Sequence, residues 1–293
     1  MRTVFELGDG LALAVVEMPD TAERPGPGAV GPYPTSGLQK GLLLLDEGQE
    51  LSSEGVGFAV PVLKRGPRAV FPGSAEITVS RGSPRSVTMT FTMDRVERLG
   101  GRRRRRLFLY RPLDEAREAF ALLYRRVPLL RRPLLAASNG IRWLLRVRTR
   151  FEQTTPVAVV PVTCTAGEAP GDVLVTADLS HLPETVTEIV LMNELGADVF
   201  GRYLDSDGGD LRGASIGAWN QVRAATGSFL AEKGGVAFTL ESDPDPAAPG
   251  VRLFRGREVA RGRLAWAGFG YSLRPGPPSF TYRLHIGRGE VSP

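Results

Sequence analysis

The feature that most constrains the fold is a succession of short runs in which apolar and polar residues alternate, separated by turns rich in Gly, Pro and Asp. Alternation of this kind predicts β-strands with one buried face, and short turns predict antiparallel pairing of consecutive strands. Val4–Leu7 and Leu11–Met18, for example, flank a turn at residues 8–10. Strands seldom alternate with helical segments, which argues against doubly wound and α/β-barrel folds. We therefore predict an all-β fold, a mostly antiparallel β-sandwich.

One stretch departs from this pattern and predicts a single helical segment near 113–136. Apolar residues recur in it at helical spacing: Ala116, Ala119, Phe120 and Leu123. Acidic residues near its start and arginines near its end match the helix dipole. The segment divides the chain into an N-terminal β module at 1–112, a helical connection at 113–140 and a C-terminal β module at 141–293. One large sandwich is the alternative to two joined modules.

Composition limits the compartment and the cofactors. Cys164 is the only cysteine, so no disulfide can form within the chain. Glu6 and Asp9 interrupt the place where a signal peptide needs an apolar run, and no apolar stretch approaches the roughly 20 residues that span a bilayer. We expect a soluble, cytoplasmic protein. One Cys and two His cannot build a zinc site of the usual kind, and we expect neither a metal nor a cofactor.

Positive charge is concentrated in the middle of the chain. The formal net charge is +5, yet residues 95–150 contain 17 arginines against four acidic residues, so the remainder is net acidic. The basic middle could bind an anionic partner, or the two regions could neutralise each other. The run Arg102–Arg106 has the composition of a nucleic-acid patch, but it follows a Gly-Gly turn and predicts a partly paired edge strand.

A row of arginines is the more specific signal for an anion site. Four of them share one face of the predicted strand Ile141–Phe151: Arg142, Arg146, Arg148 and Arg150. Neighbours two positions apart in a strand are about 6.6–7 Å apart, so the row repels itself unless carboxylates or an anionic ligand face it. Nucleic acid is not favoured, because no interleaved aromatic module is present. The segment Ala119–Leu135 could lie on a membrane surface, but packing of that segment on a sheet is favoured.

A second candidate site follows the predicted strand Val186–Met192. It combines acidic residues with amides and aromatic rings: Asn193, Glu194, Tyr203, Asp205, Asp207, Asp210, Arg212, Trp219 and Asn220. The spacing of the three aspartates resembles a calcium loop, but a tight turn is the favoured interpretation. Rings that stack and carboxylates that accept hydrogen bonds are suited to a sugar. Glu194 with Asp205 or Asp207 could also act as the acid and base of glycoside hydrolysis.

Two other motifs lack the context that their chemistry needs. Ser215 lies in a G-x-S-x-G pattern and is followed by Asp243 or Asp245 and then by His285, the chain order of α/β-hydrolases. No buried strand leads into it and no helix follows. The G-x-G-x-x-G match at residues 26–31 is flanked by prolines and opens no helix either. We reject the dinucleotide site and do not favour the triad.

Three functions remain, in order of preference. The first is a ligand-binding β-sandwich for an anionic or carbohydrate-like small molecule or glycan, without turnover. The second is a carbohydrate-active hydrolase or lyase that uses paired carboxylates. The third is a lipid-binding barrel that resembles lipocalins in architecture only. The sequence leaves the oligomeric state open.

Overall fold

The computed structural model describes most of both predicted β regions. It covers these residues: 1–16, 37–51, 55–66, 68–80, 82, 84–101, 147–196, 200–217, 220–231, 236–242, 250–260 and 263–288. Every strand pairing in these ranges is antiparallel, which confirms the predicted all-β antiparallel fold. The predicted helical segment near 113–136 lies outside the described residues. No described helix is long and apolar enough to cross a bilayer.

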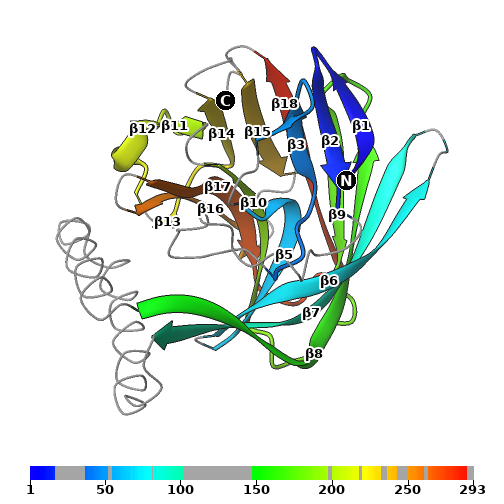
Figure 1. Cartoon of the computed structure of the whole chain (residues 1–293), viewed down its shortest axis with the longest axis vertical. Coiled ribbons are helices and arrows are strands. Elements are labelled where there is room, and N and C mark those ends of the chain that lie inside the picture. The colour runs from blue at the N-terminus through cyan, green and yellow to red at the C-terminus, as the bar shows by residue number, and fades with distance from the viewer. Residues whose placement is uncertain are drawn as a thin grey trace.

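The strands form two sheets (Figure 1). The four-stranded sheet consists of β1 (Arg2–Gly8), β2 (Leu11–Val15), β3 (Leu43–Asp46) and β4 (Gln49–Glu50). The 14-stranded sheet consists of β5 (Gly57–Arg65), β6 (Arg68–Ser80), β7 (Ser86–Gly101), β8 (Val147–Ala166), β9 (Asp172–Asp178), β10 (Glu188–Leu195), β11 (Phe200–Asp205), β12 (Asp210–Arg212), β13 (Asn220–Gln221), β14 (Thr226–Ala231), β15 (Val236–Ser242), β16 (Arg252–Ala260), β17 (Arg263–Leu273) and β18 (Ser279–Arg288). A 3₁₀ turn, η3 (Gly213–Ser215), follows β12.

The large sheet folds over so that its two halves face each other. Its strand order is β12-β11-β14-β15-β18-β9-β8-β7-β6-β5-β10-β17-β16-β13. Phe269 on β17 nevertheless stacks on Phe229 of β14, with ring centroids 5.4 Å apart. Tyr271 on β17 likewise meets Tyr282 of β18 at 5.5 Å. Strands from opposite ends of the order therefore share one core, as expected for a sandwich.

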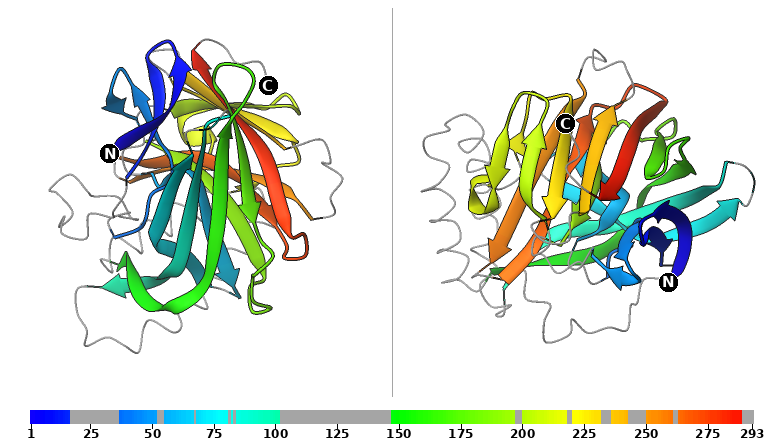
Figure 2. Two further views of the ribbon diagram at one scale, coloured as in Figure 1. Left: turned by 90° about the vertical axis from the view of Figure 1, so that its right-hand side faces the viewer. Right: turned by 90° about the horizontal axis from the view of Figure 1, so that it is seen from above.

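The long strands β6, β7 and β8 join the two halves, and Figure 2 shows them curving around one side of the molecule. Sequence patterning splits each of them in two, because polar or Pro-containing residues interrupt the alternation. The structure instead places irregularities in the ladder there: between Phe71 and Ser74 in β6, and between Met93 and Arg95 in β7. Such bulges bend a strand and increase its twist without ending it.

One continuous apolar core lies between the halves and extends to the four-stranded sheet. Inward-facing residues of β18 and β9 are fully buried, including Leu284, Val173 and Val175. A bridge between Leu42 and Phe58 connects the segment before β3 to β5. Full burial of a side chain of this size stabilises the fold by about 1.5–3 kcal/mol, so this core is the main stabilising element.

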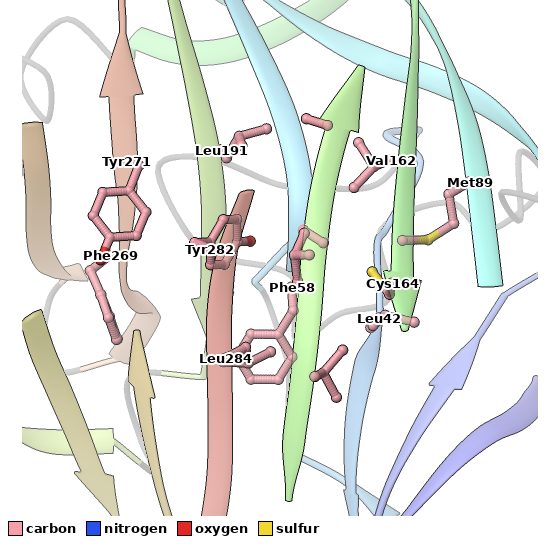
Figure 3. Close-up of a cluster of buried hydrophobic side chains, with 14 of the residues drawn as sticks. Leu42, Phe58, Met89, Val162, Cys164, Leu191, Phe269, Tyr271, Tyr282 and Leu284 are labelled. Atoms are coloured by element: carbon pink, nitrogen blue, oxygen red, sulfur yellow. The ribbon is translucent and has the colours of Figure 1, made fainter. Parts of the chain in front are cut away.

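Cys164 on β8 is part of this core, and Figure 3 shows it among apolar side chains that include Leu42, Phe58 and Met89. Burial raises the pKa of its thiol from 9.0 to about 12. We therefore expect no reaction with a thiol reagent at pH 8 in the folded protein and one equivalent after unfolding, because the thiolate is the reactive species.

The same shift gives a pH dependence of stability. The folded pKa lies above the unfolded one, so the contribution of Cys164 is fully present below pH 9 and is lost as the pH rises toward 12. Chemical denaturation of Cys164→Ala should show a shallower loss over that range. Rapid labelling of the native wild-type protein at pH 8 would contradict the burial.

Candidate functional site

The two edge strands of the large sheet are neighbours in sequence, and with β11 they carry five of the candidate residues: Tyr203, Asp205, Asp210, Arg212 and Asn220. β12 forms one edge and β13 the other, and residues 213–217 follow β12 in the direction of β13. Gly217 O accepts a hydrogen bond from the backbone N–H of Arg257 at 2.7 Å, and Val222 N–H donates to Leu253 O at 2.9 Å. We call this junction the seam. It is built from β11 and β12 on one side and β13 and β16 on the other.

At the seam, an arginine that sequence analysis did not select lies between the two sides. The guanidinium of Arg255 on β16 lies over the ring of Tyr203 on β11, 5.2 Å from its centroid. It also donates to Ile216 O in the segment after β12. Asn220 on β13 pairs directly with Arg255 in the ladder. An arginine within a strand of mixed sequence gave no spacing signal, so only the strand order could reveal it.

Tyr203 is fully buried, so its ring is not offered to a ligand at the surface. Burial, reinforced by the nearby Asp205 carboxylate, raises the pKa of its hydroxyl well above the ordinary value. The ring packs between Phe229, at 5.2 Å, and Phe269, at 6.4 Å. Tyr203 therefore packs against the Arg255 guanidinium on the side of the core and helps to position it.

The three aspartates after β11 have different roles. The Asp205 Oδ1 accepts hydrogen bonds from the backbone N–H groups of Asp207 at 3.1 Å and Gly209 at 2.8 Å, which confirms the predicted tight turn. Asp207 is exposed. Asp210 receives two bonds from Arg202, both 3.1 Å, and this pairing lowers the pKa of its carboxyl.

Arg212 lies beside this pair and is the more accessible cation. Its Nε is 3.8 Å from Asp210 Oδ1, and its side chain is 68% exposed. Arg202 and Arg212 are direct ladder partners, so they project from the same face of the β11–β12 pair. One carboxylate therefore lies against two guanidinium groups at the edge of the sheet.

Asn193 and Glu194 belong to a different place, inside the β5–β10–β17 region. Asn193 is fully buried, and its Oδ1 accepts from Ala59 N–H at 3.0 Å and from Tyr282 O–H at 2.9 Å. The Glu194 carboxylate accepts from Val56 N–H at 3.3 Å. Hydrogen bonds from backbone and core groups thus engage both side chains. Asp205, by contrast, stabilises the turn after β11.

The structure describes only two of the four arginines in the predicted row. Arg148 and Arg150 lie on β8, where their ladder partners are Gly100 and Arg98. Arg142, Arg146 and Trp219 lie outside the described residues. The row and the stacking tryptophan therefore stay predictions. Among the residues that the structure describes, no group of three or more His, Cys, Asp or Glu side chains could hold a metal ion.

Comparison with known proteins gives a fold but no family. No family model matches the chain, and no curated protein matches it. Among solved structures, the fold is similar to that of the α-N-acetylgalactosaminidase NagBb from Bifidobacterium bifidum in complex with GalNAc, with a TM-score of 0.52 at 10% sequence identity. The similarity covers 99% of this chain but 37% of the glycosidase chain. At this identity the comparison supports the fold alone: this chain is similar to a β portion of a larger carbohydrate-active protein.

Proposed function

We propose that this chain is a carbohydrate-binding β-sandwich that holds a glycan with an anionic group at the seam. The placement of Arg255 carries this proposal, because it joins the Tyr203 ring, the segment after β12 and Asn220 at one point. Arg257 follows on the same face of β16, about 6.6–7 Å further along the strand. Two guanidinium groups and an amide thus occupy one end of the sandwich.

These groups match the chemistry of such a ligand. A sugar hydroxyl both donates and accepts, and an amide side chain can satisfy both roles. A guanidinium carries five N–H donors in a planar fork, so Arg255 can bond the loop carbonyl and a carboxylate or sulfate together. The fold similarity to a glycosidase is in keeping with a carbohydrate ligand. The positions of Glu194 and Asp205 give no comparable support to a hydrolase, since each carboxylate holds backbone N–H groups.

Isothermal titration calorimetry with a neutral oligosaccharide and its uronate-containing counterpart tests the proposal. We expect Asn220→Ala to weaken both ligands about tenfold, the equivalent of one hydrogen bond of about 1.4 kcal/mol. Arg257→Gln should weaken the uronate about 10–100-fold and leave the neutral ligand unchanged, because only the anionic group uses the charge.

Arg283→Gln is the matched control, since Arg283 is exposed on β18 away from the seam. It should bind both ligands as wild type does. Equal losses of uronate affinity in Arg257→Gln and Arg283→Gln would show that the effect comes from the net charge of the protein and not from the seam. Absence of binding by the wild-type protein at millimolar ligand would refute the proposed function.

A further inference from the structure

Among the strands that the structure describes, none covers one edge of β6 over most of its length. One side of the strand pairs with β7 from Val70 to Ser80, but the other side pairs with β5 only from Arg68 to Val70. Pro72 O accepts a hydrogen bond from Gln39 N–H at 2.9 Å. Beyond that point, in residues 74–80, no strand of the described chain pairs with this side. Figure 1 shows the β6–β7 hairpin extending beyond β5.

The hydrogen-bond pattern shows which groups face this edge. Ala166 N–H donates to Arg85 O, so odd-numbered residues at the start of β7 bond to β8. Even-numbered residues of β7 then bond to β6, and their partners are residues 74, 76, 78 and 80. The N–H and C=O groups of Ala75, Ile77 and Val79 consequently point away from β7, toward the open edge.

The side chains of this segment alternate in kind. Ala75, Ile77 and Val79 are partly buried and pack against the main core. Ser74, Glu76, Thr78 and Ser80 are exposed on the outer face. Natural proteins usually protect an open edge with Pro, charged side chains (especially Lys) or a bulge; residues 74–80 contain no Pro, Lys or bulge, and Glu76 is their one charged side chain.

We propose that β6 pairs antiparallel with β6 of a second copy of this chain, around a two-fold axis at Ile77. Ile77 then faces Ile77 of the second copy, and Ala75 faces Val79. On the outer face Glu76 meets Thr78, and Ser74 meets Ser80. Apolar positions then meet apolar ones and polar positions meet polar ones, and every contact of one residue with another is repeated across the axis, as in an isologous interface.

The number of hydrogen bonds and the charges favour this register. With the axis at Ile77, the N–H and C=O groups of Ala75, Ile77 and Val79 in the two copies form six backbone hydrogen bonds, whereas an axis at Thr78 gives four. An axis at Glu76 places two carboxylates directly opposite each other, which is destabilising. In the Ile77 register the two Glu76 side chains are diagonal neighbours, about 7–8 Å apart, and repel only weakly.

The outer face of the sheet is suited to such a continuation. A row of threonines crosses five adjacent strands: Thr281, Thr176, Thr163, Thr88 and Thr78. The hydroxyls of Thr176 and Thr281 are 3.0 Å apart, as are those of Thr88 and Thr163. Thr78 ends this row at the open edge, and pairing with Glu76 of the second copy extends the polar row into it.

Sedimentation analysis over a concentration series tests the inference. The wild type should dimerise with a dissociation constant in the micromolar range. Ala75→Pro should weaken the dimer at least tenfold and remain folded by circular dichroism, because the lost N–H faces the open edge and not β7. Glu76→Gln should strengthen the dimer a few-fold by removing the diagonal repulsion.

Disulfide trapping tests the register. The double variant Glu76→Cys/Thr78→Cys should form a covalent dimer under mild copper oxidation, since its cysteines face each other across the axis at a separation that a disulfide can bridge. Each single cysteine variant serves as the matched control and should trap far less. A wild type that stays monomeric at all concentrations, or trapping by Thr78→Cys alone equal to that of the double variant, would overturn the proposal.

Discussion

Replacing Asn193 with Leu should cost about 2–6 kcal/mol of unfolding free energy, although Leu has nearly the same shape. Two donors in the core, Ala59 N–H and Tyr282 O–H, depend on the Asn193 oxygen. A buried donor that loses its acceptor costs about 1–3 kcal/mol, and here two are affected at once. The Ala59 backbone has a φ of +63°, unusual for a residue other than Gly, and the bond to Asn193 helps to hold it there.

The matched variant is Tyr282→Phe, which removes a donor and leaves Asn193 bonded to Ala59. We expect it to cost about 0.5–1.5 kcal/mol in urea denaturation. The double variant should cost less than the sum of the two single ones, because it leaves no orphaned hydroxyl. If Asn193→Leu proves as stable as wild type, the polar group in this core has no structural role.

Gly268→Ala should destabilise the fold by about 3 kcal/mol or more. A Cβ at Gly268 on β17 would lie 2.1 Å from Asn193 O and 2.9 Å from the Cα of Glu194. Both are backbone atoms of β10, so neither can turn away as a side chain could. Two paired strands would have to separate, and overpacking of this kind costs 1–3 kcal/mol, occasionally more.

The comparison is with Gly82→Ala, in the loop between β6 and β7. Among the described residues, a Cβ there would meet only Ser80 Oγ, at 3.5 Å. Its stability should therefore stay within about 0.5 kcal/mol of wild type. Thermal denaturation of the two variants side by side would show whether close approach or loss of glycine entropy dominates; equal shifts would contradict the steric explanation.

Local pattern predicted the strands of this protein better than their connections. The Val4–Leu7 and Leu11–Met18 hairpin corresponds to β1 and β2, because alternation and a Gly-rich turn are both local signals. The pattern divided β8 at the polar residues before Val157, yet the strand runs from Val147 to Ala166. Pairing with β7 skips residues 154–157 and resumes at Gln153, so the strand continues although its ladder is interrupted there, and such pairing is not visible in one strand's sequence.

The candidate site shows the same limit. Asp205 was predicted to form a tight turn, and it does, since an Asx turn depends on residues within four positions. Asn193, by contrast, is next to Glu194 and near Tyr203 in sequence but is buried in the core against Ala59. Arg255 was missed altogether, because it meets Tyr203 only through the folding-over of the sheet.

The interleaved strand order also has a consequence for the rate of folding. Lys64 on β5 pairs with Glu188 on β10, and the two are 124 residues apart in the chain. A chain that must close such a loop loses conformational entropy before the contact can reward it, and proteins dominated by long-range strand pairs fold slowly. Unfolding must break the same distant pairs, so the large sheet should be long-lived once formed. The order of its strands would then govern both how quickly the protein folds and how slowly it unfolds.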